Sequence, residues 1–262
     1  MTHPAGFDYR VREKLLAART YYVATTGADT NDGLTVGAPF LTIQKAIDTV
    51  CSIDLSIYQA TISVADGTYT GANTLYPYLG ALPPIIQGNT TTPANAIIST
   101  TSANCFTSLN AGSWAIKGFK LTTVTSGHCV LSNGMTYIDL ASIEFSTTAS
   151  THVYCANQGA VFFSTAYAIT GGAAYHIISS GGVYTQSAKS NTASGTFAFS
   201  SAFAYTSRMG RIYSAGNTWT GGTITGTRYT ADNLSLIQTG GGGANYFPGN
   251  SAGSVATGAV YT

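Results

Sequence analysis

Three of the four histidines in this chain, His128, His152 and His176, stand 24 residues apart. A fixed period of this length constrains a fold more than any single motif, because it indicates a structural unit that stacks on copies of itself. The period also holds in other columns of the sequence. The triplets 119–121 and 143–145 occupy the same place in successive rows, and both read apolar, charged, apolar.

Each row of the repeat holds three short runs of β-favouring residues separated by turn residues, and no row holds an amphipathic stretch of helical length. In the run 137–140, Ile138 and Leu140 face one way and Asp139 faces the other. Three strands and three turns in about 24 residues are typical of a right-handed parallel β-helix. We therefore predict an all-β fold with three-strand coils. A β-sandwich is the alternative, but hairpin signals between clean strands are few.

The composition excludes several classes of protein. Charged residues make up 8 % of the 262 positions, against about 25 % in a typical soluble domain. A net charge of +1 gives no basic surface for nucleic acid, and the lack of any run of about 20 apolar residues argues against membrane insertion. The four cysteines show no C-x-x-C spacing, so we expect free thiols. We expect no bound metal and no cofactor.

The sequence divides into four segments. We expect an N-terminal segment over 1–20, a cap with a strand and a helix over 21–56, the parallel β-helix over 57–225 and a closing segment over 226–262. A solenoid needs caps because its terminal coils would otherwise expose unpaired strand edges and the apolar interior.

The cap carries a family resemblance. A strand, an Asn-Asp-Gly turn at 31–33 and the string Pro-Phe-Leu-Thr-Ile-Gln-Lys-Ala-Ile-Asp at 39–48 resemble the N-terminal cap of pectin-lyase-like β-helix proteins. The closing segment is similar to that of β-helix proteins encoded by phages. Together these resemblances imply a small phage tailspike, tail fibre or head fibre, and such proteins are typically homotrimers fixed to the virion by their N-termini. They specify a fold more than an activity.

Basic residues are concentrated at the start of the chain. Four of the eleven, Arg10, Arg12, Lys14 and Arg19, lie in the first twenty positions, and the stretch 7–20 has the strongest helical pattern. On the tailspike resemblance, we predict that this segment anchors the protein to a phage tail or capsid protein. Basic groups at one end of a nearly neutral rod would attract an acidic partner.

Asp139 and Glu144 are the only close pair of carboxylates after the first coil. Glycosidases cleave with two carboxylates at a fixed separation, so these two are the candidate catalytic residues of a glycan-degrading hydrolase or lyase. Glu144 also stacks above Lys120 in the repeat, which predicts an ion pair instead. Phe163, placed beside Asp139 in the repeat, is the candidate glycan-binding residue, since an outward aromatic ring stacks on sugars.

The repeat makes two structural predictions. The three equally spaced histidines should form a ladder of like side chains. The first strand of each row reads apolar throughout, as in 129–131 and 153–155, and strands buried on both faces lose their alternation. We therefore expect this sheet to face the coil interior on one side and a neighbouring subunit on the other.

These observations favour a structural phage protein. We expect a homotrimer on the virion surface, assembled in the host cytoplasm, that contacts host cell-surface polysaccharide. The alternative is a polysaccharide depolymerase on the same scaffold. The small number of carboxylates favours the structural protein.

Overall fold

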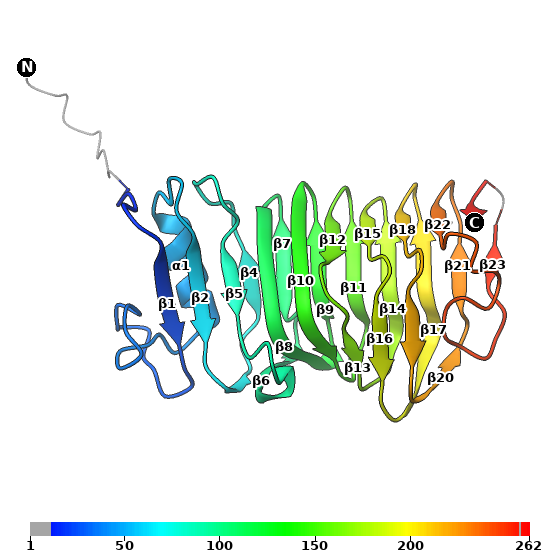
Figure 1. The fold of residues 1–262 in the computed structure, drawn as a ribbon, viewed down its shortest axis with the longest axis horizontal. Helices are drawn as coiled ribbons and strands as arrows, with labels where there is room; N and C mark the ends of the chain where they lie inside the picture. Colours follow the sequence, from blue (N-terminus) through cyan, green and yellow to red (C-terminus); the bar gives the residue numbers. More distant parts are fainter. Residues whose placement is uncertain (1–11, 257) are drawn as a thin grey trace, which may run out of the picture.

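The computed structural model describes residues 12–256 and 258–262. They form a right-handed β-solenoid of about 8 turns, with the helix of the cap near one end and the C-terminal coil at the other (Figure 1). Every pairing between the named strands is parallel. The prediction of a parallel β-helix is confirmed, and the β-sandwich alternative is wrong.

Strands of successive coils pair into three faces along the rod. The first face contains β1 (Arg19–Val23), β2 (Ala60–Val64), β5 (Ile85–Gln87), the first half of β8 (Gly112–Ser126), the first half of β10 (Thr136–Phe145), β12 (Ala160–Phe163), β15 (Val183–Thr185), β18 (Arg211–Tyr213), β22 (Leu236–Gln238) and β24 (Val260–Tyr261). The long strands β8 and β10 bend and continue into the second face, so these two faces belong to one sheet.

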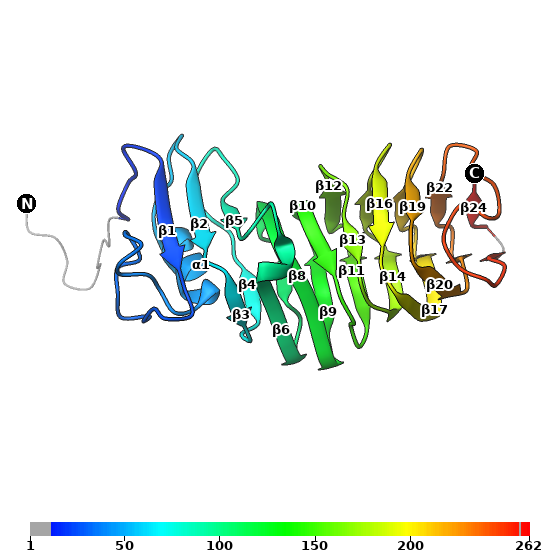
Figure 2. The same ribbon diagram turned by 60° about the horizontal axis from the view of Figure 1, so that its bottom comes forward.

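The second and third faces complete each coil. The second face contains β3 (Gly67–Tyr69), β6 (Ala96–Ser102), the second halves of β8 and β10, β13 (Ala168–Ile169), β16 (Ser190–Ala193) and β19 (Thr218–Thr220), which follow one another along the rod in Figure 2. The third face contains β4 (Asn73–Leu75), β7 (Phe106–Leu109), β9 (His128–Asn133), β11 (Thr151–Ala156), β14 (Ala173–Ser180), β17 (Thr196–Ser207) with β20 (Thr223–Gly226) beside it, β21 (Tyr229–Ala231) and β23 (Ser254–Val255).

The core consists of inward side chains stacked in columns. On the first face, Ile62, Ile86, Ile116, Leu140 and Phe163 follow one another in register, and each is almost completely buried. Complete burial of one such side chain contributes roughly 1.5–3 kcal/mol to folding. The columns explain why the strands alternate, since every second residue must be apolar to continue a column.

The period of 24 holds at Lys120, Glu144 and Ala168 on the second face, whereas on the third face it loses one residue between β9 and β11. Lys120, Glu144 and Ala168 pair in register, whereas His128 pairs with Thr151 and is therefore one position away from the expected column. The segment 146–150 is one residue shorter than the corresponding segment 122–127 of the preceding coil, which shifts the register. The predicted three-histidine ladder is wrong, because only His152 and His176 are neighbours in one column, where their rings meet edge to face.

The cap closes the N-terminal end of the core with a helix, as predicted. Helix α1 (Ile43–Ser52) begins after Thr42, whose hydroxyl accepts a hydrogen bond from the Lys45 backbone N–H at 3.2 Å. The buried side of the helix consists of Ile43, Ala46, Ile47 and Val50. A single turn of 3₁₀-helix, η1 (Pro93–Asn95), lies between β5 and β6.

The segment 12–20 does not form the predicted helix. Lys14 makes a parallel bridge with Asp54, Leu15 is completely buried, and the last residues of the segment begin β1. The Leu15 N–H donates to the Asp54 carbonyl at 2.8 Å, so pairing with the chain after α1 replaces the local helical hydrogen bonds. Residues 7–11 of the predicted helix lie outside the described residues.

The C-terminal end is closed by aromatic side chains and a last coil. The ring centroid of Phe247 lies 5.7 Å from that of Phe203 and 5.6 Å from that of Trp219. The ring centroids of Tyr246 and Trp219 are also 5.6 Å apart. These rings cover the end of the apolar interior, which would otherwise meet water.

The cysteines are free thiols, as predicted; Cys105, Cys129 and Cys155 are buried and Cys51 is half-buried. Among residues 12–256 and 258–262, no helix combines the length and apolar character that crossing a bilayer requires. Within the same residues, no cluster of three or more His, Cys, Asp or Glu side chains has the arrangement of a metal site.

Candidate functional site

The predicted ion pair between Lys120 and Glu144 is confirmed. Lys120 Nζ lies 2.8 Å from Glu144 Oε1 on the outer side of the second face. The Thr170 hydroxyl donates to the same carboxylate oxygen at 2.8 Å. A depression of about 280 Å³ lies over Glu144 and is bordered by small side chains such as Ser142 and Thr192. The carboxylate is already paired with a cation and a hydroxyl, which suits a structural contact.

Asp139 lies on a different face from Glu144. It sits in register between Ala115 and Phe162 on the first face, and the backbone turns at Ser142, which has a φ of 50°. Outward side chains on adjacent faces of a coil diverge, so the structure does not bring the two carboxylates to one site. Asp139 Oδ1 is buried and receives no hydrogen bond from the described part of the chain.

Phe163 does not face outward, and its predicted glycan-stacking role is wrong. The side chain is 1 % exposed and pairs in register with Leu140 inside the coil. This coil is one residue shorter than the period of 24, so the neighbouring Phe162 takes the outward place opposite Asp139. The Phe162 ring stacks on Tyr137, with ring centroids 6.4 Å apart and planes 20° apart.

Burial raises the pKa of Tyr137, and the charge of Asp139 adds to this effect. The two outward rings and the carboxylate therefore form one small group on the first face. Aromatic rings next to a hydrogen-bond acceptor suit contact with a sugar, whose C–H face packs on the ring while its hydroxyls donate. The 24-residue period predicted an outward aromatic ring in the correct strand, β12, but assigned it to Phe163 instead of the adjacent Phe162.

An apolar column runs along the outer side of the third face. Leu131, Tyr154, Ile178 and Tyr205 follow one another in register and are each partly exposed. The column continues with threonine at either end, at Thr107 and at Thr230. These strands are the ones whose sequences read apolar throughout, so their outward residues are those expected at a subunit contact.

Three of the four predicted anchor residues lie against the first coil. Arg12 Nη1 donates to the Cys51 carbonyl at 3.1 Å, and Arg19 Nη1 lies 2.6 Å from Glu13 Oε1. The hydrogen bond to Tyr21 raises the pKa of Arg19, burial opposes this shift, and the contact with Glu13 adds to it. Lys14 is held by its backbone, as described above, and Arg10 lies outside the described residues.

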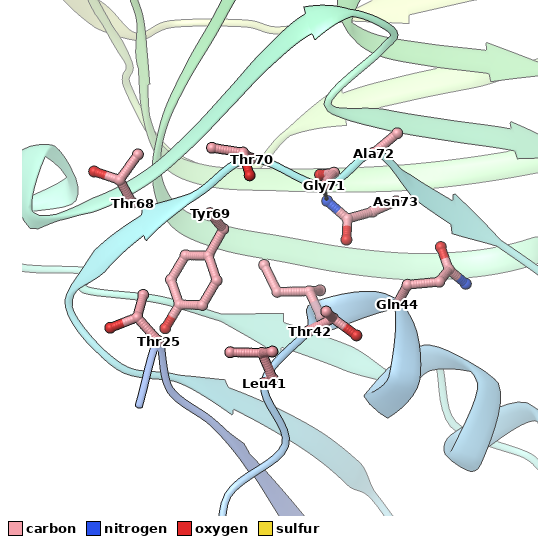
Figure 3. A pocket seen from close by; sticks show the side chains of 11 residues that line it. Thr25, Leu41, Thr42, Gln44, Thr68, Tyr69, Thr70, Gly71, Ala72 and Asn73 are labelled. Carbon is pink, nitrogen blue, oxygen red and sulfur yellow. Dashed lines mark hydrogen bonds between the residues drawn. The ribbon is translucent and has the colours of Figure 1, made fainter. Parts of the chain in front are cut away.

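A cavity of about 350 Å³ lies between the start of α1 and the segment that joins β3 to β4, and the sequence analysis did not identify it (Figure 3). Tyr69, Ile43 and Asn73 are buried and form its floor, whereas Thr68 and Thr70 are exposed at its mouth. Only the Thr-Tyr-Thr string at 68–70 was visible in the sequence as a signal, and threonine occurs in many of the other strands.

Comparison with known proteins found no relative whose function could be transferred to this chain. No family model matches the chain, and neither the curated proteins nor the solved structures contain a match. The fold therefore rests on the coordinates alone, and the candidate sites rest on their own geometry.

Proposed function

We propose that this chain is a structural protein of a phage virion, a tailspike- or fibre-like homotrimer of the pectin-lyase-like type that contacts host surface polysaccharide. The observation that carries the proposal is the apolar column Leu131–Tyr154–Ile178–Tyr205 on the third face of a long solenoid. A partly exposed apolar stripe of this kind marks a surface for protein contact. Three copies packed through one face each make a closed assembly with no free stripe.

A non-catalytic role fits the carboxylates. Glu144 is neutralised by Lys120 and Thr170, and it lies on a different face from Asp139. A glycosidase needs two carboxyl groups that flank one bond. The outward pair Tyr137 and Phe162 is the surface that we propose for polysaccharide contact, in place of Phe163.

The anchoring function is proposed for the N-terminal end. Strand β1, which begins at Arg19, and the cap helix lie at one end of the rod, while the C-terminal coil lies at the other (Figure 1). Arg12 and Lys14 join the same end through Cys51 and Asp54. In a parallel homotrimer, three copies of these basic residues would meet one tail or capsid partner, and we propose that this contact holds the protein on the virion surface after assembly in the host cytoplasm.

The assembly is tested by light scattering on the purified chain. We expect a mass three times that of one chain. Ile178→Glu, in the middle of the column, should give monomers, whereas Thr230→Glu, at the end of the same column, should leave the trimer intact. A wild-type protein that is monomeric at micromolar concentration would contradict the proposal.

The virion role is tested on particles. Gold-labelled antibody to the chain should decorate purified particles in electron micrographs, and the free protein should compete with particles for adsorption to host cells. Tyr137→Ala combined with Phe162→Ala should weaken that competition without changing the trimer. Particles that carry no label would contradict the virion role whatever the oligomeric state.

The alternative function is a polysaccharide depolymerase, and it rests on Asp139. Its buried Oδ1 has no partner in the described part of the chain, and it lies beside the Tyr137–Phe162 pair. If this site is catalytic, purified protein releases oligosaccharides from host polysaccharide and Asp139→Asn abolishes the release. We expect the unaltered protein to release none.

A further inference from the structure

The cavity in the N-terminal cap has a lining that contains no charged side chain. Its walls are threonine, glutamine, asparagine and small residues, with Leu41, Ile43 and Tyr69 as apolar surface. A charged ligand would lose its hydration here and gain no counter-charge, which is costly. A volume of about 350 Å³ falls in the range of sites that enclose a small molecule.

The start of α1 borders the cavity but does not offer an anion site. Asp29 Oδ1 already accepts the backbone N–H groups of Leu41 and Thr42, each at 2.9 Å, and Asp29 Oδ2 accepts from the Thr42 hydroxyl at 2.8 Å. The Asp29 carboxylate therefore places a negative charge beside the helix start, where it opposes the binding of a phosphate or carboxylate. The ligand of this cavity should be neutral.

Several polar groups in the lining are also committed. Gln44 Oε1 accepts the Thr74 N–H at 2.6 Å, and Gln44 Nε2 donates to the Thr74 carbonyl at 3.2 Å. The Tyr69 hydroxyl donates to the Ala65 carbonyl at 2.9 Å. These contacts fix the walls, and they leave the Gln44 amide and the tyrosine proton without a role in binding.

Asn73 is the exception. Its side chain is 2 % exposed, and Nδ2 donates to the carbonyls of Gly71 at 3.2 Å and Cys105 at 3.0 Å. Two carbonyl partners fix the orientation of the amide, because a flip would set oxygen against oxygen. Oδ1 accepts no hydrogen bond from the described residues, and Figure 3 shows it turned from Gly71 toward the start of α1. Because both Nδ2 hydrogens are held by those carbonyls, Oδ1 is left as a fixed acceptor at the cavity wall that a donor on a ligand can reach.

From these contacts we infer that the cap cavity binds a neutral sugar residue, with a sugar hydroxyl donating to Asn73 Oδ1. The side chains of Thr25, Thr68 and Thr70 lie at the mouth and are exposed to solvent. Their hydroxyls can donate hydrogen bonds to the remaining sugar hydroxyls and accept hydrogen bonds from them. The C–H face of the sugar would pack on Ile43 and Tyr69. This site lies in the cap, apart from the outer aromatic pair, and so goes beyond the proposed function.

Gly71 allows the cavity to be blocked without straining the backbone. A Cβ added at Gly71 meets no atom within 4 Å, and the residue does not have a positive φ, so Gly71→Leu fills open space at the cavity. Gly37 has the same two properties and does not line the cavity, which makes Gly37→Leu a matched control. Both variants should unfold at the same temperature as the unaltered chain.

The test is saturation-transfer difference NMR of the full chain with glucose, galactose, mannose and N-acetylglucosamine, and with the charged probes glucuronate and glucosamine. We expect a saturation-transfer signal on at least one neutral sugar. That signal should fall at least tenfold in Gly71→Leu and stay unchanged in Gly37→Leu. Thr68→Val combined with Thr70→Val should weaken it without blocking the cavity. No transfer to any neutral sugar, equal transfer to the charged probes, or transfer that survives Gly71→Leu would each overturn the inference. Because free sugars and no particles are used, the result is independent of the virion role.

Discussion

The rings of His152 and His176 are joined by a hydrogen bond of 2.8 Å between their Nδ1 atoms, and both side chains are fully buried. The Ser146 carbonyl only accepts, so His152 Nε2 donates to it at 2.9 Å and His152 Nδ1 accepts from His176. His176 Nε2 then accepts from the Tyr167 hydroxyl at 2.8 Å, which itself accepts from Trp219 Nε1 at 3.0 Å. Every member of this chain is satisfied when both rings are neutral.

Acid should therefore destabilise the protein. Burial lowers the pKa of His152 to about 3 and holds that of His176 well below its usual range, whereas both titrate near about 6.5 in an unfolded chain. Below that pH the unfolded state binds protons that the folded state excludes, so the free energy of unfolding falls, by roughly 3 kcal/mol per pH unit for the pair. Above about pH 6.5 the pair contributes no pH dependence. Urea unfolding at neutral and at acidic pH measures the effect.

The control is a variant without the pair. His152→Phe combined with His176→Phe should lower stability at neutral pH but make its fall in acid much shallower, because the two fully buried imidazoles are gone and only the partly buried His128, whose pKa burial also lowers, remains. In His128→Phe the free energy of unfolding should still fall in acid almost as much as in the unaltered protein, since His128 is only partly buried. A urea midpoint that is equal at pH 5 and pH 7 in the unaltered protein would contradict the prediction.

Loss of Lys120 should cost more than loss of both partners of its ion pair. The Lys120 and Glu144 side chains are 27 % and 14 % exposed, so Lys120→Met leaves a shielded carboxylate with only the Thr170 hydroxyl. We expect a loss of about 2 kcal/mol. Adding Glu144→Gln to that variant should recover most of it, and a double-mutant cycle by urea unfolding checks this. Additive effects of the two changes would show that the pair is not coupled.

The same substitution should cost much more stability at Phe163 than at Phe162. Phe163→Ala empties part of the core column and should cost about 3–5 kcal/mol. Phe162→Ala removes an outward ring and should cost under about 1 kcal/mol. Each variant is the control for the other, since the two residues are adjacent in β12. Equal losses in thermal unfolding would mean that the register of this strand differs from the one described.

The sequence was enough to predict the coil, and it predicted contacts wherever the period stayed regular. Lys120 and Glu144 were paired correctly because alternation and the 24-residue spacing both hold there. The outward role of Phe163 was wrong because one shortened coil exchanges inside for outside. Pairing of residues 12–15 with a distant segment overrides a local helical pattern, which leaves Leu15 in the core. Asn73 Oδ1 points into the cavity because Nδ2 donates to the Cys105 carbonyl, 32 residues away, and no sequence pattern predicts that contact.

Two truncations separate the anchor from the fold. Removing residues 1–11 keeps every cap contact described above, from the hydrogen bond between Arg12 and Cys51 onward, and we expect those contacts to hold the cap closed. Removing residues 1–20 also deletes Leu15, which is completely buried, and the start of β1, which pairs with β2 from Arg19. Loss of one buried leucine alone costs about 2–5 kcal/mol, so the longer truncation should unfold at a clearly lower temperature.

Leu15→Ala in the full-length chain is the matched variant for these truncations. It should reproduce a large part of the stability loss of the 1–20 deletion while keeping every basic residue of the anchor. If virion incorporation needs the basic end itself, Leu15→Ala still incorporates at low temperature, where it stays folded, and Arg12→Ala combined with Lys14→Ala does not. A 1–20 deletion as stable as the intact protein would contradict the cap packing, because it would mean that Leu15 and the first strand add nothing to the core.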